Sequence, residues 1–223
     1  MLKSHLFPSG RIRIYWDGAA LLAHADSLCD PSLNWLDLPA MAPAGVAHVW
    51  IAPAPPERAQ RAAIATYGRA LRAHGVDCRP APSPGAAAEC LRCGHGWDDH
   101  ARASELALAL AVLEDGLAGA FDAAFVFASP GLLAAVAKPL GRLFPDKRLG
   151  RVTLGPAPQR RAGALASPSL RLEAVRLPSG VEGQDGALIA QPACWRPVVA
   201  PPARLPFTKL PARSTRLTGG VSP

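Results

Sequence analysis

The chain has 223 residues, 49% of them hydrophobic, which is enough for the core of one domain of ordinary size with a tail, or of two small domains. Its formal net charge is +7, and nearly all of the excess lies in residues 156–223, where nine Lys/Arg stand against three Asp/Glu; such a segment attracts nucleic acid or anionic surfaces, or is a solvated basic tail. No apolar run approaches the roughly 20 residues of a membrane helix or forms a secretion signal, and an odd count of five cysteines argues against a disulfide framework, so we expect a soluble cytoplasmic protein with no membrane partner.

Strand-like and helix-like patterns alternate along the first 155 residues. Residues 11–16 (RIRIYW) alternate in character, and residues 47–52 (AHVWIA) form the short apolar run of a strand that is covered on both faces. Between residues 56 and 75, apolar residues recur with helical spacing and arginines occupy the other side. Strands are predicted at residues 11–16, 47–52, 76–81, 123–129 and 147–154, and helices at residues 56–75, 103–119 and 131–144.

This alternation predicts right-handed βαβ crossovers and an α/β fold of three layers, PIN-like or Rossmannoid, with a mainly parallel central sheet of about five strands. One domain is expected over residues 1–155. Residues 156–188 are expected to form a C-terminal extension that packs on it, with SLRLEAVRL (169–177) as one more strand or an edge element. Residues 189–223 are Pro-rich, basic and acid-free, so we expect a partly disordered tail.

Two acids stand where an α/β fold places chemistry. Asp17 ends the first predicted strand, and the carboxyl ends of parallel strands form the ligand crevice. An acid there either binds a hard cation or caps the following helix. Glu105 lies near the start of an apolar helix, where the helix dipole also favours an acid. Asp122 precedes the fourth strand, where a plain turn acid is the ordinary role.

Two further segments carry groups with known chemistry. Cys90 and Cys93 have the spacing of two zinc ligands, and Cys78, His95 and His100 are candidates to complete the four, although no second CxxC exists. The alternative is a cysteine-containing loop without metal. Ser129 lies in the turn FASPGLL, where a Gly-bearing helix start can receive a phosphate, although the turn matches no phosphate-binding loop pattern.

In order and spacing these segments resemble the NYN family, the PIN-like, ribonuclease-related domains of bacteria, over about residues 11–195. IYWDGAALL is similar to the first strand of that family, an apolar run followed by Asp-Gly-x-Asn. CLRCGHGW is similar to a Cys-x-x-Cys-Gly segment of one bacterial subgroup. RASELALALAVLEDGLAGAFDAAFVFAS resembles the catalytic helix and the strand after it, and RLFPDKRLGRVTL and QPACWRP resemble later stretches of the subgroup.

The resemblance implies a PIN-like fold and, in active members, a ribonuclease whose acids hold Mg²⁺ or Mn²⁺ to activate a water molecule. By position Asp17 matches the first acid, Glu105 the helix acid, and Arg102 the lysine that precedes it. The departures are Ala20 in place of the asparagine, and Pro130 and Leu132 in place of two acids.

These departures remove an amide and two carboxylates from the expected metal site. The resemblance therefore implies a catalytically impaired or inactive member, a pseudoenzyme that acts as an RNA-binding or regulatory module, with Arg102 and Ser129 facing nucleic acid. One alternative is an active metal-dependent endoribonuclease that uses Asp17 and Glu105 with Asp99 or Asp122 as a third acid. Another is a protein-interaction scaffold without a nucleic-acid role.

Overall fold

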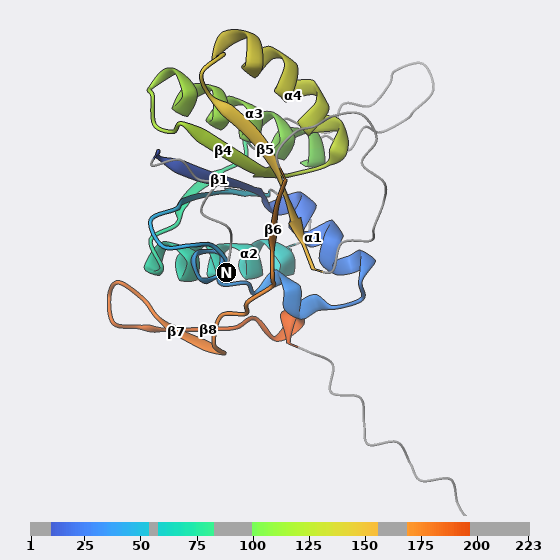
Figure 1. Cartoon of the computed structure of the whole chain (residues 1–223). Coiled ribbons are helices and arrows are strands. Elements are labelled where there is room, and N and C mark those ends of the chain that lie inside the picture. The colour runs from blue at the N-terminus through green and yellow to red at the C-terminus, as the bar shows by residue number, and fades with distance from the viewer. Residues whose placement is uncertain (1–9, 54–57, 83–99, 156–168, 197–223) are drawn as a thin grey trace, which may run out of the picture.

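A central sheet of six parallel strands organises the computed structural model, which describes residues 10–53, 58–82, 100–155 and 169–196 (Figure 1). The strands lie in the order β3-β2-β1-β4-β5-β6, and every neighbouring pair is parallel. Their bounds are β1 (Ile12–Asp17), β2 (Ala47–Ala52), β3 (Asp77–Pro80), β4 (Ala123–Phe127), β5 (Arg148–Leu154) and β6 (Ser169–Leu172). The predicted three-layer α/β fold with a mainly parallel sheet is confirmed, with six strands instead of about five.

The sixth strand lies at the edge of the sheet, next to β5. Its residues alternate between exposed and buried, with Leu170 and Leu172 facing the core. This period of two is the pattern of a strand with one buried face, and SLRL joins the sheet as its edge strand, one of the two possibilities that the sequence left open.

Four helices cover the two faces of the sheet (Figure 1). Helices α1 (Gly18–Ser27) and α2 (Arg58–Ala73) pack on one face, and α3 (His100–Leu117) and α4 (Pro130–Leu143) pack on the other. Because side chains alternate along a strand, Trp16 of β1 enters the first core and its neighbour Tyr15 enters the second. Within the described ranges, no helix combines the length and the apolar character needed to cross a membrane.

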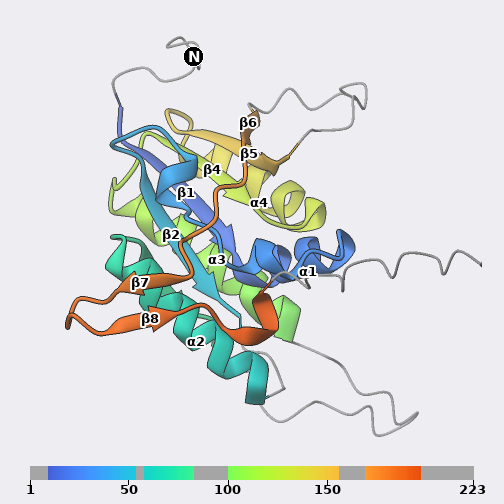
Figure 2. The ribbon, with the colours of Figure 1, turned by 90° about the horizontal axis from the view of Figure 1, so that it is seen from below.

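The C-terminal part of the described chain returns to the face that carries α1 and α2. Strands β7 (Gly180–Glu182) and β8 (Leu188–Ala190) form an antiparallel hairpin beside α2 (Figure 2), and a 3₁₀ turn, η4 (Ala193–Trp195), follows. Trp195 is only 6% exposed and meets the Tyr67 ring edge-on, with 5.8 Å between the ring centroids. Residues 189–196 are therefore packed structure, where the sequence led us to expect the start of a tail, because Ile189 and Trp195 bury apolar surface.

Candidate acidic site at the ends of strands β1 and β4

The order of the strands creates a crevice at one edge of the sheet. From β1 the chain moves through α1 to β2 on one side, whereas β4 and β5 lie on the other side of β1. In open α/β sheets ligands bind where the order reverses, outside the carboxyl ends of the strands. Asp17 is the last residue of β1, and Ser129 follows β4 by two residues, so both predicted site residues lie at this edge.

Asp17 is held inside the protein by its own helix and by α3. Its carboxylate is 2% exposed and accepts a hydrogen bond from the Ala19 backbone N–H at 3.0 Å, which caps α1. The Ser104 hydroxyl donates to the same oxygen, Oδ1, at 2.6 Å. Burial raises the pKa of Asp17, although the hydrogen bonds from Ser104 and the backbone act in the opposite direction.

Glu105 joins the site from the first turns of α3. Its charge also raises the pKa of Asp17, so the two carboxylates lie within electrostatic reach of each other. The Ser129 hydroxyl donates a hydrogen bond to Glu105 Oε1 and accepts one from the Leu132 backbone N–H at 3.3 Å, which caps α4. The site thus consists of two acid–hydroxyl pairs, Asp17 with Ser104 and Glu105 with Ser129.

This arrangement fits a divalent cation poorly. Mg²⁺ requires near-octahedral oxygen ligands and keeps several waters, so its site must be open and charged. Asp17 is closed off from solvent, its Oδ1 already has two donors, and burial disfavours the charge that a cation needs. Across the part of the chain that the structure describes, no three His, Cys, Asp or Glu side chains gather as metal ligands would.

The structure separates the remaining candidates from this edge or does not describe them. Asp122 lies just before β4, at the opposite edge of the sheet, where it accepts a hydrogen bond from the Arg11 backbone N–H at 2.7 Å. It therefore cannot be the third acid beside Asp17. The Cys78 thiol, on β3, is half-buried and directed at the Gly68 and Val76 carbonyls at 3.6 Å, and burial raises its pKa to about 11.

Several predicted residues lie outside the described structure. These are Cys90, Cys93, His95 and Asp99, together with the side chains of His100, Arg102 and Pro130. The zinc prediction and the prediction that Arg102 contacts nucleic acid stay predictions.

Sequence reasoning missed the role of Ser104. A serine inside an apolar helix carries no local signal of a partner, because its hydroxyl ordinarily bonds to the helix backbone or to water. Here α3 packs against β1, and the fully buried Ser104 hydroxyl reaches the Asp17 carboxylate, although the two residues are 87 positions apart in the sequence.

A second buried acid, Asp115, lies toward the other end of α3. It accepts hydrogen bonds from Arg13 Nη1 at 2.6 Å, from the Tyr15 hydroxyl at 2.8 Å and from Arg79 Nη2 at 3.0 Å. Burial by itself would raise the pKa of Asp115, but the Tyr15 and Arg79 hydrogen bonds outweigh it and hold the pKa below its ordinary value. The cluster fastens α3 to β1 and β3, and its donors leave the carboxylate no free side for a ligand.

The sequence also left unassigned an arginine stripe on α2, which we define as Arg58, Arg61, Arg69 and Arg72. All four side chains are exposed, and none forms an ion pair with any acid of the described residues. At 3.6 residues per turn they fall within an arc of about 80°, opposite the buried face, and they extend over about 21 Å of helix. A groove of about 510 Å³ runs beside Arg69 and Arg72, between α2 and the β7–β8 hairpin.

Comparison with known proteins adds little to this geometry. No family model matches the chain, and no curated protein matches it. Among solved structures, the chain is similar to a protein of unknown function from Vibrio parahaemolyticus, with 16% sequence identity and a TM-score of 0.43. That similarity covers 64% of this chain and 80% of the other.

Proposed function

We propose that the chain is a PIN-like module of the NYN type that binds RNA and is impaired as a nuclease. The observation that carries the binding half of this proposal is the arginine stripe on α2, whose four guanidinium groups have no acidic partner among the described residues. The observation that supports impaired nuclease activity is the hydrogen bond from the Ser104 hydroxyl to the buried Asp17 carboxylate. The resemblance to the NYN family supplies the class of ligand.

An unpaired row of arginines favours a ligand with repeated negative charges. Guanidinium groups bind phosphate oxygens with two parallel hydrogen bonds, and each phosphate that they neutralise releases a counterion. The stripe is far longer than one phosphate group and faces away from the core, so a flexible nucleic-acid strand can follow it. Asp185 lines the adjoining groove, but its carboxylate Oδ1 is bonded to the Ala187 backbone N–H at 3.1 Å within its own turn.

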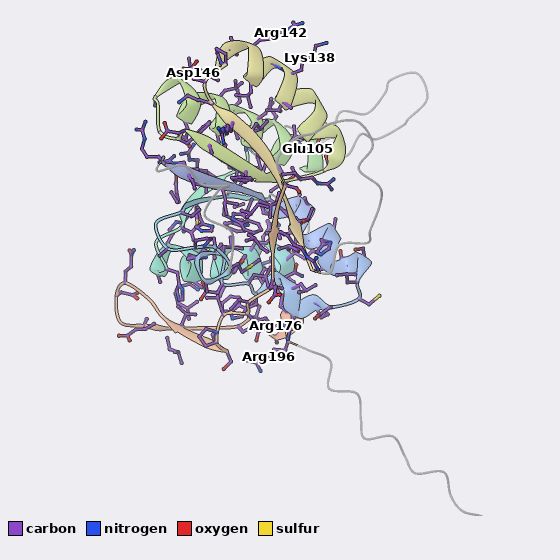
Figure 3. The ribbon with its side chains drawn as sticks, viewed as in Figure 1. Glu105, Lys138, Arg142, Asp146, Arg176 and Arg196 are labelled. Carbon is purple, nitrogen blue, oxygen red and sulfur yellow. The ribbon has the colours of Figure 1, made fainter. Side chains whose placement is uncertain are left out.

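The binding test compares two charge-removal variants of the full chain. We expect the R61Q/R69Q variant to bind a fluorescent single-stranded RNA more weakly than the parent, for every sequence tested. The magnitude of the slope of log K against log salt should fall by about 1.4, because two phosphate contacts are lost. The matched control is K138Q/R142Q, which removes two exposed charges that α4 carries outward on the other side of the sheet (Figure 3). Its affinity and slope should remain close to those of the parent.

Two other results would contradict the binding proposal. Equal losses in both variants would show that only total charge matters and that α2 is not the interface. No RNA binding by the parent protein would favour a protein-interaction scaffold instead.

Nuclease activity is tested separately. We expect the parent protein with Mn²⁺ to cleave labelled single-stranded RNA no faster than its Asp17→Ala variant, because burial disfavours the charged form of the Asp17 carboxylate. RNA cleavage that depends on Asp17 would overturn the proposal that the protein is impaired as a nuclease. It would establish an active endoribonuclease.

A further inference from the structure

A small cavity lies next to the acidic site, beside the start of α1. Its volume is about 10 Å³, and it lies among α1, β2, α2, the 3₁₀ turn η2 (Pro31–Asn34) and Trp195. Most of its wall is apolar, formed by leucine, isoleucine and aromatic side chains. Two polar side chains, Asn34 and Trp50, interrupt this apolar lining.

Both polar side chains bury an atom that lacks a partner. Asn34 is 6% exposed and Trp50 is 2% exposed, and neither Asn34 Oδ1 nor Trp50 Nε1 finds a hydrogen-bond partner among the described residues. The other two fully buried indoles are bonded, since Trp16 Nε1 donates to His48 Nδ1 at 3.1 Å and Trp35 Nε1 donates to the Pro178 carbonyl at 2.8 Å. Buried polar groups in folded proteins are almost always paired, with protein or with ordered water.

Glycine at position 18 keeps this region open. A Cβ atom at Gly18 would lie 3.0 Å from Trp50 Nε1, 2.6 Å from the Ile51 carbonyl oxygen and 2.5 Å from Pro53 Cδ. The indole N–H therefore lies against the one residue of the cavity wall that has no side chain. Trp50 and Asn34 are both among the residues that line the cavity.

We infer that this cavity holds a single ordered water molecule, which accepts a hydrogen bond from Trp50 Nε1–H and donates one to Asn34 Oδ1. An indole N–H only donates and an amide oxygen only accepts, so a water that accepts once and donates once satisfies both. The volume is close to the roughly 10–15 Å³ that one water molecule requires. The water links β2 to η2 and lies next to α1, the helix that Asp17 caps.

The solution test uses the indole N–H groups of the full chain labelled with ¹⁵N-tryptophan. We expect the Trp50 indole proton, assigned by its loss in Trp50→Phe, to show a dipolar cross-peak to a long-lived water. The Trp16 and Trp35 indoles are internal controls, because their acceptors are protein atoms, and they should show none. Absence of the Trp50 cross-peak, or its presence equally at all three indoles, would overturn the inference.

Substitution and crystallography provide an independent check. Asn34→Leu has nearly the same shape but no acceptor, and we expect it to abolish the Trp50 cross-peak. A high-resolution crystal structure of the parent chain should show one water within about 3 Å of both atoms. If Trp50 Nε1 instead donates to a protein atom there, the water does not exist, and this holds whether or not the Asn34→Leu protein folds.

Discussion

At the scale of residues, two buried aspartates show how neighbours decide the charge of an acid. The pKa of Asp17 is raised because burial outweighs the hydrogen bonds that it accepts from Ser104 and the backbone. The pKa of Asp115 is lowered because burial is outweighed by the hydrogen bonds from Tyr15, Arg79 and Arg13. Two guanidinium groups stabilise the charged form of a neighbouring carboxylate. A hydroxyl group stabilises it less, and a second acid destabilises it. The acid that the sequence marks for chemistry is therefore the one whose environment disfavours charge.

The raised pKa of Asp17 predicts how its substitutions behave. When the pKa of an acid is higher in the folded chain than in the unfolded chain, the folded protein loses stability as the pH rises. The loss builds up between the ordinary pKa, about 3.9, and the raised pKa of the folded state. Asp17→Asn removes this loss and retains an oxygen for the α1 cap, so at pH 7 we expect it to be at least as stable as the parent. Asp17→Ala loses the cap and should cost about 0.5–2 kcal/mol.

Urea unfolding at pH 7 and at pH 3 measures both effects. The advantage of Asp17→Asn over the parent should shrink at pH 3, where the carboxyl is mostly protonated in the folded and unfolded chains alike. If Asn and Ala are equally destabilising at pH 7, the charge of Asp17 supports the fold and our reading of its pKa is incorrect.

At the scale of elements, the two helices that begin at the crevice differ in how tightly their first residues are packed. Helix α1 begins at Gly18, with the Ile51 carbonyl and Pro53 against its backbone, whereas at Gly131 in the first turn of α4 a Cβ atom would meet nothing within 4 Å. Each helix is capped by a side chain that also takes part in the site, Asp17 for α1 and Ser129 for α4. Helix capping and the acid–hydroxyl pairs are thus built from the same atoms.

The two glycines form a matched pair for substitution by alanine. Gly18→Ala places a methyl group 2.6 Å from a backbone oxygen of β2, which cannot move without disturbing the sheet, so we expect a cost of about 1–3 kcal/mol. Gly131→Ala gains helix propensity without a clash and should be neutral or stabilising by up to about 1 kcal/mol. Thermal unfolding of both variants decides this, and equal effects at the two positions would refute the tight contact at Gly18.

At the scale of the whole molecule, residues near the C-terminal end of the described structure contribute to the hydrophobic core. Tyr67 of α2 is surrounded by three indoles, those of Trp35, Trp50 and Trp195, which come from distant parts of the chain. The Tyr67 hydroxyl donates to the Leu36 carbonyl at 2.9 Å, so the cluster also joins α2 to the segment after α1. The segment that ends at Trp195 is accordingly part of the core that covers one face of the sheet.

Removing the Trp195 side chain should therefore destabilise the entire fold. We expect Trp195→Ala to lower the free energy of unfolding by about 3–5 kcal/mol, as for other large buried side chains. The control from the same segment is Leu188→Ala, because Leu188 is 75% exposed, and its effect should stay within about 0.5 kcal/mol. Denaturant unfolding of the two variants measures the difference; if it is negligible, the C-terminal segment is dispensable to the core.

The sequence by itself determined the class of fold and the positions of the first five strands along the chain. Apolar runs and helical spacing are local properties, and the alternation of strand and helix leaves a parallel sheet as the physical solution. It also marked Asp17 and Ser129, because both follow directly from the ends of strands, and Glu105 through the resemblance to the NYN family. The sixth strand and the buried Trp195 escaped a definite prediction because they are short segments in Pro-rich and basic surroundings, where the local pattern is weak.

Only the tertiary structure decided what these residues face. The Ser104–Asp17 bond, the Asp115 cluster and the cavity between Asn34 and Trp50 each join side chains far apart in the chain. No local pattern encodes such contacts, because they exist only after the helices have packed on the sheet. The arginine stripe on α2 was visible as a helical pattern, but that its members lack acidic partners among the described residues became evident only when the surrounding surface was in place.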